Sequence, residues 1–369
     1  MNKNVPIKVG IIGCGWAGGT LHLPALKSLP YAEVVAIADI DQHRLSQVGN
    51  EHGIKNRYTD FMELLKNNEV EVVAVCVPAK SHAEIAIAAL DAGKHTFIEK
   101  PLALTMGEIE LLIEKANVSP GQATVGFNLR CHRLVREARK MIREGALGKI
   151  ESIRSTWTSD VRHYRNMPAW RNKREEGGGT LIEIAIHHFD LWRFLLESEV
   201  EEVYALTRSL EWDDQIAAVN ARMANGAIVS SFFSELTSNN NEIEIHGRKG
   251  SLLISCYRFD GLEFQPILRT PGAISARAKK AAKTVSNLHQ AVTTMRRGGE
   301  FMASFRAEWE NFLLSIKNNT PVDCTLQDGM AAVKIALATA QSASLGMPVK
   351  VTQAPREIRT VRSDLRIQI

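Results

Sequence analysis

The chain has 369 residues, of which 45% are hydrophobic and 23% are charged, with a formal net charge of +4. A chain of this length usually forms two domains, and this composition is that of a globular protein rather than a fibrous or disordered one. No apolar run approaches the roughly 20 residues that a membrane span needs, and the first residues lack the apolar core of a signal peptide.

The cysteines indicate the compartment. There are five (Cys14, Cys76, Cys131, Cys256 and Cys324), scattered and never in a Cys-x-x-Cys pair. This pattern argues against a disulfide framework and against a cysteine zinc site, and no other cluster of metal ligands stands out, so we expect no metal site. This pattern suits the reducing cytoplasm, where we place the protein.

The first predicted strand leads into a glycine-rich loop. Lys8–Ile12 is a continuous apolar run, as in a strand buried on both faces. A Gly-x-Gly-x-x-Gly loop follows at once, ahead of an amphipathic stretch to Leu29. We expect this loop to cradle a pyrophosphate at the start of a helix. Its predicted cofactor-binding residues are Gly13, Gly15, Trp16, Ala17 and Gly18.

The second predicted strand ends in an acid. Glu33–Ala38 is apolar and Asp39 follows it, about 20 residues past the loop, where a carboxylate accepts hydrogen bonds from the adenosine ribose. Such a carboxylate repels a 2′-phosphate, which favours NAD. Arg44 lies close behind and leaves NADP open.

The alternation of strand and helix continues. Val70–Val77 and His95–Ile98 read as further buried strands with a helix, Ser81–Ala92, between them. Pro78 and Lys100 follow these strands, at the carboxyl edge where ligands bind in open parallel sheets. The pattern predicts an α/β domain with a doubly wound parallel sheet.

A predicted helix that begins with three glycines lies near the middle of the chain. After Gly177-Gly178-Gly179, a helix places Glu183 and His187 four residues apart on one face. A carboxylate that holds one imidazole nitrogen leaves the other free to take a proton. His188 points about 100° away, and we expect packing or support from it.

The remaining segments predict a second, different domain. Five strand-like stretches between Ile150 and His246 follow one another without a long helix between most of them, which indicates an antiparallel or mixed sheet. Asn225-Gly226 and Arg248-Lys249-Gly250 are predicted turns. Glu300–Ile316 and Leu326–Leu345 are predicted helices. Just before the three glycines lie Tyr164, Trp170 and Arg171, which are positioned to cover the site. They either bind sugar hydroxyls or a phosphate of the substrate, or serve only in packing.

Positive charge gathers in two places. Seven basic residues and no acidic one lie between Phe264 and Gly299, and the tail after Pro355 carries four arginines. The basic stretch fits a solvated helix face, a phosphate-bearing substrate, an anionic surface or a partner subunit. It lacks the interleaved aromatic residues of a nucleic-acid site, so we expect no nucleic-acid partner.

Four motifs together resemble the Gfo/Idh/MocA family of oxidoreductases. They are the loop Gly13–Gly18, Pro78–His82, Glu99-Lys100-Pro101 and the helix from Gly177 to Asp190, in family order from about Lys8 to Val351. The resemblance implies a Rossmann domain (1–127), an α+β domain with a large open, mainly antiparallel sheet (128–354) that makes oligomer contacts, and a basic tail (355–369).

The resemblance also implies roles. Lys100 matches the family lysine that hydrogen-bonds the reacting hydroxyl, and His187 matches the acid/base histidine. Glu183 stands where aspartate is usual, so it either still holds the imidazole or contacts substrate. The resemblance also makes His82 and Glu99 expected cofactor-binding residues. In the stretch that joins the two domains, Asn128 and Arg130 are expected to contact the substrate.

The expected activity is hydride transfer between NAD and a secondary alcohol or ketone of a sugar, cyclic polyol or sugar derivative. Two alternatives stay open at this point. One is a redox-assisted glycosidic cleavage that regenerates the cofactor. The other is a dinucleotide-binding regulator without chemistry.

Overall fold

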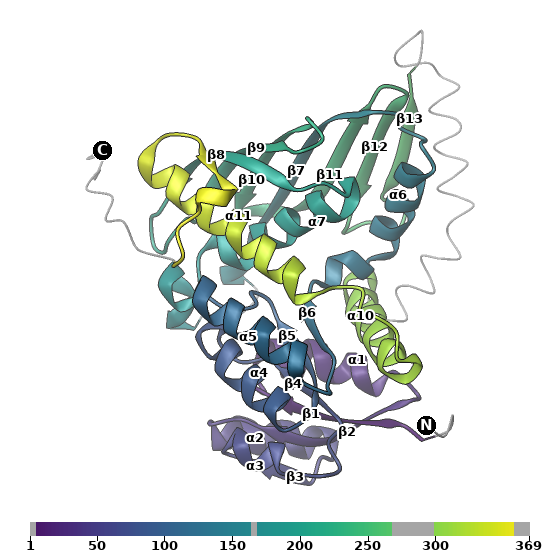
Figure 1. Cartoon of the computed structure of the whole chain (residues 1–369), viewed down its shortest axis with the longest axis vertical. Helices are drawn as coiled ribbons and strands as arrows, with labels where there is room; N and C mark the ends of the chain where they lie inside the picture. The colour runs from purple at the N-terminus through teal and green to yellow at the C-terminus, as the bar shows by residue number, and fades with distance from the viewer. Residues whose placement is uncertain (1–4, 164–167, 268–298, 358–369) are drawn as a thin grey trace.

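The computed structural model describes residues 5–163, 168–267 and 299–357, and these form two sheets with helices around them (Figure 1). Tyr164, the seven basic residues of the predicted stretch and the tail beyond Glu357 lie outside the described residues. No described helix combines the length and the apolar character needed to cross a membrane.

The first sheet has six parallel strands in the order β3-β2-β1-β4-β5-β6. Strand order reverses between β1 and β4, which is the switch point where a Rossmann sheet binds its ligand. The doubly wound parallel sheet predicted from the sequence is thus confirmed. The strands are β1 (Ile7–Ile12), β2 (Ala32–Ala38), β3 (Asn56–Tyr58), β4 (Val72–Val75), β5 (His95–Glu99) and β6 (Ala123–Gly126).

Helices cover both faces of this sheet. The first of them begins as a π-helical turn (Trp16–His22) directly after the glycine loop. Three others begin with side-chain caps from Asp41, Asp60 and Thr105, which satisfy backbone amides of the first turn. The helices are α1 (Leu23–Lys27), α2 (Gln42–His52), α3 (Phe61–Leu65), α4 (His82–Asp91) and α5 (Met106–Val118).

The second sheet has eight strands in the order β13-β12-β11-β7-β10-β9-β8-β14. Only β7 and β10 pair in parallel, and every other pair is antiparallel, as the sequence predicts. The two predicted turns join β9 to β10 and β11 to β12. The strands are β7 (Ile150–Asp160), β8 (Val200–Arg208), β9 (Ile216–Met223), β10 (Ile228–Ser234), β11 (Leu236–Gly247), β12 (Gly250–Ser255), β13 (Leu262–Pro266) and β14 (Val349–Lys350).

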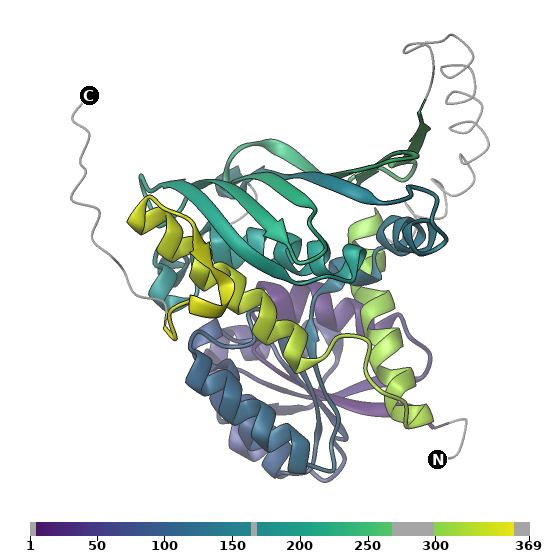
Figure 2. The same ribbon diagram turned by 45° about the horizontal axis from the view of Figure 1, so that its top comes forward.

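One face of the large sheet is covered and the other is open. Helices α6 (Arg133–Arg143), α7 (Ile186–Leu196) and α11 (Leu326–Leu345) lie on the covered face, and α11 runs between the two sheets (Figure 2). Side chains alternate along each strand, so every second one points to the open face. There Leu206 and Ile228 are 59% and 50% exposed.

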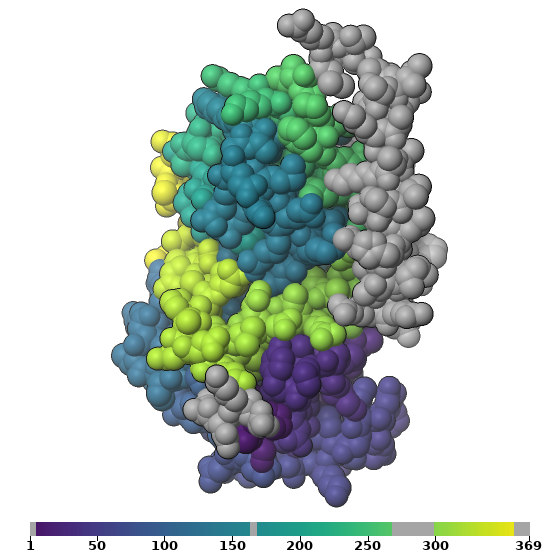
Figure 3. All heavy atoms as spheres, turned by 90° about the vertical axis from the view of Figure 1, so that its right-hand side faces the viewer, coloured from purple at the N-terminus to yellow at the C-terminus, as the bar shows by residue number. Residues whose placement is uncertain are grey.

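Helix α10 (Gly299–Asn318) corrects the predicted domain division. The sequence assigned residues 128–354 to the second domain, but Phe305 and Phe312 share one apolar cluster with β1. The Trp309 ring stacks on Phe97 with centroids 4.4 Å apart, and its Nε1 donates to His22 Nδ1 at 2.9 Å. In Figure 3 this helix forms a band against the beginning of the chain.

Helix α11 belongs to both cores. Val333 and Leu337 pack with the strands of the first domain, whereas Ile335 and Ala338 pack with the second. Small alanine side chains let the two domains approach this helix closely on opposite sides. The two domains therefore share one helix of their cores.

Candidate active site and cofactor site

The glycine loop is tight everywhere except at Gly15. Gly13 has φ +96°, a value that favours glycine, and a Cβ on it would lie 2.3 Å from the Cys76 carbonyl oxygen. A Cβ on Gly18 would lie 1.9 Å from the Gly13 carbonyl oxygen. A Cβ on Gly15 would meet nothing within 4 Å. The loop thus leaves open space where a pyrophosphate would approach the backbone, so these residues fit a dinucleotide.

This contrast gives a prediction. Gly15 has φ −68°, which any residue adopts, so Gly15→Val should fold normally. Its side chain would fill the cradle, and we expect NADH affinity to fall on the order of 100-fold, about 2.7 kcal/mol. Fluorescence titration with NADH measures the affinity, and thermal unfolding provides the control. Normal NADH binding by this variant would rule out Gly15 as part of the cradle.

Asp39 lies at the end of β2, as predicted, and it organises the loop. Its Oδ2 accepts a hydrogen bond from the Cys14 amide at 2.7 Å, and its Oδ1 accepts one from the Asp41 amide at 2.9 Å. Each carboxylate oxygen has a further lone pair for a ribose hydroxyl. Arg44 Nη1 lies 3.5 Å from both oxygens, which balances part of the negative charge.

His82 was predicted to contact the cofactor, and this structure gives it a different place. The ring is buried, and its Nδ1 and Nε2 lie 2.6 Å and 2.8 Å from the carbonyl oxygens of Pro101 and Val77. Each ring nitrogen therefore faces a main-chain carbonyl oxygen, and the nitrogen that carries the proton donates to one of them. His82 ties the loop after β4, which begins near Pro78, to the segment after β5. It shapes the site instead of lining it.

Glu99 lies behind Lys100 and is held from two sides. Because Trp309 donates to Nδ1 of His22, the His22 proton sits on Nε2, which donates to Glu99 Oε1 at 2.6 Å. The other carboxylate oxygen accepts from the Lys100 amide at 3.0 Å. Burial opposes ionisation of Glu99, but the His22 hydrogen bond and nearby positive charge outweigh it and lower its pKa. The predicted cofactor contact is thus a brace for the Lys100 backbone.

Lys100 bridges the two domains. Its Nζ donates to the main-chain carbonyl of Glu183 at 2.9 Å and lies 3.6 Å from Glu183 Oε2. Both side chains are mostly buried, at 13% and 10% exposure. An ammonium from the carboxyl edge of the Rossmann sheet therefore meets the helix of the second domain.

The predicted pair of Glu183 and His187 does not form. Glu183 Oε2 lies 2.8 Å from Arg171 Nη1, and His187 Nδ1 is buried without a hydrogen-bond partner. One reason is local: residues Leu181–Ala185 form a π-helical turn, so the four-residue spacing does not have its α-helical geometry. The other reason is the guanidinium, a stronger partner than an imidazole. Of the two predicted roles for Glu183, holding the imidazole is therefore not seen, and contact with the substrate stays a prediction.

Arg171 links two buried carboxylates. Its Nη2 lies 2.8 Å from Glu235 Oε1, and Glu235 is 1% exposed. The close approach of Gly178 explains its position, since a Cβ there would lie 2.1 Å from the Arg171 carbonyl oxygen. Trp170, also predicted to cover the site, lies beside this guanidinium, with the Arg171 carbon 5.9 Å from its ring centroid.

His187 lies in an apolar setting beside Lys100. Its ring packs on Trp157, with centroids 5.2 Å apart, and edge-on against Phe127. The pKa of His187 lies well below its usual value because burial disfavours the cation, and because Lys100 and His188 oppose protonation. His187 is therefore a neutral imidazole at neutral pH, with Nδ1 free of any partner among the described residues.

His188 has the packing role that the sequence predicts. It is fully buried between Trp157 and Phe233, and Nε2 lies 3.1 Å from Asn241 Oδ1. Burial lowers its pKa from 6.5 to about 4, against the opposing effect of the Asn241 hydrogen bond.

This burial predicts acid sensitivity. Between pH 6.5 and 4 the unfolded chain binds a proton at His188 that the folded chain does not, so stability is full above pH 6.5 and is lost as the pH falls toward 4. At 1.36 kcal/mol for each pKa unit, His188 alone should remove about 3 kcal/mol across this window. Urea unfolding of His188→Gln should show a flatter pH dependence than the parent. Equal slopes in both proteins would contradict the prediction.

Asn128 and Arg130 do not face the substrate region, contrary to the sequence prediction. Asn128 Nδ2 donates to Ser304 Oγ of α10 at 2.8 Å. Arg130 binds both oxygens of Asp190, at 2.7 Å and 2.5 Å, and reaches Asp328 at 3.1 Å. Both residues are buried. They fasten the segment that joins the two domains to α10, α7 and the start of α11.

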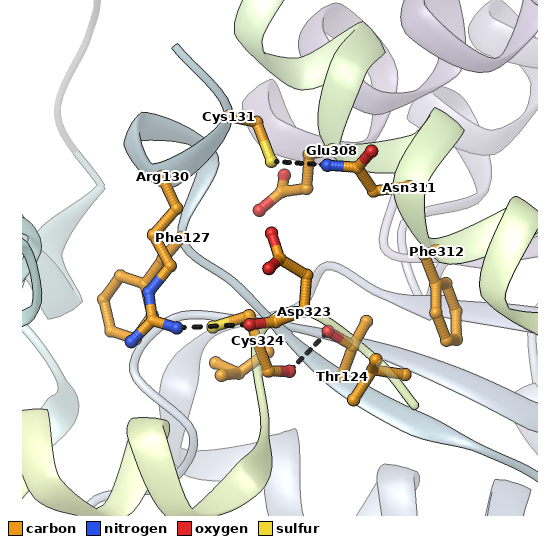
Figure 4. A pocket seen from close by; sticks show the side chains of 11 residues that line it. Thr124, Phe127, Arg130, Cys131, Glu308, Asn311, Phe312, Asp323 and Cys324 are labelled. Carbon is orange, nitrogen blue, oxygen red and sulfur yellow. Dashed lines mark hydrogen bonds between the residues drawn. The ribbon is translucent and has the colours of Figure 1, made fainter. Parts of the chain in front are cut away.

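A small pocket beside this segment is separate from the site. Figure 4 shows Arg130 and Thr124 reaching the backbone around Asp323 and Cys324, and Asn311 donating to the Cys131 thiol. Glu308 also lines the pocket, and burial raises its pKa well above the usual value. Neither Lys100 nor His187 lines the pocket.

The sequence missed Glu235. It is an isolated acid at the end of β10, in no motif and 52 positions from Glu183, so only the folded chain brings it to Arg171. Within the described residues no group of three or more His, Cys, Asp or Glu side chains is arranged to hold a metal ion.

Comparison with known proteins agrees with this geometry. Residues 7–127 match the model described as "Oxidoreductase family, NAD-binding Rossmann fold", and residues 135–253 match the GFO/IDH/MocA C-terminal domain. Myo-inositol 2-dehydrogenase of Thermotoga maritima is 30% identical over 67% of this chain and 74% of its own length. Levoglucosan dehydrogenase of Pseudarthrobacter phenanthrenivorans is 32% identical over 70% of this chain and 75% of its own length.

Solved structures extend the similarity to the whole fold. The structure titled "Levoglucosan dehydrogenase, complex with NADH" has 25% identity and a TM-score of 0.77, covering 94% of this chain and all of that one. A probable dehydrogenase from Thermotoga maritima has the same identity and TM-score over 95% of this chain. The loop at Gly13, the acid at Asp39 and the lysine at Lys100 thus stand in an NAD-binding oxidoreductase, and the chain belongs to the Gfo/Idh/MocA family.

Proposed function

We propose that this oxidoreductase transfers a hydride between NAD and a secondary alcohol or ketone on an uncharged sugar or cyclic polyol. The observation that carries the proposal is the meeting of Lys100 with the second domain beside His187, at the carboxyl edge of the Rossmann sheet. The curated relatives named above carry names of dehydrogenases for an inositol and an anhydrosugar.

Each residue has a part in the step. The substrate hydroxyl lies between Lys100 and His187, and the Lys100 ammonium donates to its oxygen and stabilises the developing alkoxide. His187 is neutral, so it takes the hydroxyl proton in oxidation and returns it in reduction. Such proton transfer contributes on the order of 10²–10⁴-fold. NAD, when bound, supplies the hydride acceptor.

The two cations of the site are already paired with carboxylates. Lys100 and Arg171 are each within ion-pair distance of Glu183, and Arg171 also pairs with Glu235. A phosphate or carboxylate on the substrate would have to compete with these carboxylates for the cations, which favours a neutral substrate.

A substrate panel tests the proposal. Inositols, aldoses, anhydrosugars and nucleotide sugars are each offered with NAD or NADP, and NADH or NADPH absorbance is followed. We expect turnover with an uncharged polyol or sugar and NAD. Consumption of a glycoside without net NADH would indicate redox-assisted cleavage instead. Tight NADH binding with no turnover across the panel would favour a regulator.

We also propose that the chain forms a homo-oligomer in the cytoplasm through the open face of its large sheet. Leu206, Ile228 and Phe232 are exposed apolar residues on this face. Five free thiols suit a reducing compartment. Light scattering of the parent and of Ile228→Asp tests the interface: the substitution should lower the measured mass, and equal masses would contradict it.

A further inference from the structure

Four buried charges form a continuous chain from the first domain into the second. Lys100 lies 3.6 Å from Glu183, Glu183 lies 2.8 Å from Arg171, and Arg171 lies 2.8 Å from Glu235. Glu235 stands at the far end, where Thr180 Oγ1 also reaches it at 3.4 Å. It is the member of the chain that is furthest along these contacts from the reacting centre.

The guanidinium is divided between the two carboxylates. Arg171 uses Nη1 for Glu183 and Nη2 for Glu235. A guanidinium fork prefers to bind both oxygens of one carboxylate. Glu235 holds one arm of the fork away, so Glu183 receives only the other arm and stays within reach of Lys100.

We propose that Glu235 is a positioning residue, which acts through Arg171 and Glu183 to hold the Lys100 ammonium in place. Without its carboxylate, Arg171 takes both oxygens of Glu183 and draws it from Lys100. Lys100 then loses its ionic partner, and the hydrogen bond to the Glu183 main-chain carbonyl alone holds its Nζ. The kinetic part of this role rests on the proposed function, but the effect on Lys100 itself does not.

Lysine labelling tests the proposal without any substrate. The parent and Glu235→Gln are treated briefly with an acetylating reagent, and the modification of each lysine is measured by peptide mass spectrometry. We expect modification of Lys100 to rise at least about 5-fold in the variant. Lys94 is the internal control, because it is buried and its Nζ donates to the carbonyls of Asn67 and Val70. Its modification should stay unchanged.

A matched variant separates this effect from general loosening. Asp214 is buried and pairs with Arg174 at 2.5 Å in the same part of the chain. Asp214→Asn should leave Lys100 as protected as in the parent. The proposal fails if Lys100 is unchanged in Glu235→Gln, or if Lys94 rises together with it.

A kinetic cycle tests the same link during turnover. We expect Glu235→Gln to lower kcat on the order of 30-fold, Glu235→Asp to recover part of this loss, and NADH affinity to stay the same. In a protein that already carries Lys100→Met, Glu235→Gln should lower kcat by less than about 3-fold, because the lysine that Glu235 positions is absent. Equal losses in both backgrounds would overturn the proposal. If the parent turns over no substrate, the proposed function fails, and the labelling result still decides the role of Glu235.

Discussion

Replacing Lys100 with methionine lowers kcat on the order of 10³-fold, while NADH binding changes less than about 3-fold. Methionine keeps most of the side-chain volume but removes the positive charge beside the substrate oxygen. The loss falls on kcat because the alkoxide develops only in the transition state. Stopped-flow measurement of NADH formation, with a fluorescence titration for NADH, separates the two effects.

Lys100→Met should keep the folded structure of the site, and thermal unfolding checks this. Glu183 and Arg171 stay paired at 2.8 Å when the ammonium is removed, so the variant should fold. Lys115 is an exposed lysine paired with Asp91, and Lys115→Met serves as the matched control with unchanged kcat. Parent-like turnover in Lys100→Met would remove Lys100 from the mechanism.

Replacing Asp190 with alanine destabilises the folded protein by about 3–5 kcal/mol. Asp190 is fully buried, and it holds both nitrogens of the Arg130 fork. Its removal leaves a buried guanidinium with Asp328 as its remaining carboxylate partner. Urea unfolding, followed by circular dichroism, gives the change in free energy of unfolding.

A double variant shows whether the unpaired Arg130 guanidinium causes the loss of stability. In Asp190→Ala with Arg130→Met no charge is left without its partner, so the loss should be smaller than in Asp190→Ala alone. If the double variant is instead as unstable as the two single changes added together, the cost comes from lost packing and not from Arg130.

Buried strands and local turn motifs were predictable because their signals lie within short stretches of sequence. The apolar runs at Lys8–Ile12 and Glu33–Ala38 are strands, and Asn225-Gly226 is a hairpin turn. Asp39 could be located by its distance from the glycine loop alone. These features depend on backbone geometry that neighbouring residues determine.

The polar partners of the site were not predictable in this way. Glu183 at a four-residue spacing from His187 indicated a pair, but a π-helical turn and a guanidinium from another loop changed its partner. The family resemblance made Arg130 an expected substrate contact, yet its carboxylate partner is 60 positions away on α7. Which of several buried charges pair depends on the assembled fold, and a single sequence does not contain that information.

The place of α10 has a consequence for how the chain is made. The first domain takes Phe305, Trp309 and Phe312 into its core, although its last strand, β6, ends at Gly126. A ribosome must therefore synthesise strands β7 to β13 of the second sheet before the first domain can bury His22 and Phe97 as they are found here. A fragment ending at residue 127 would expose this apolar surface, so the dinucleotide-binding unit cannot be isolated by cutting the chain after β6.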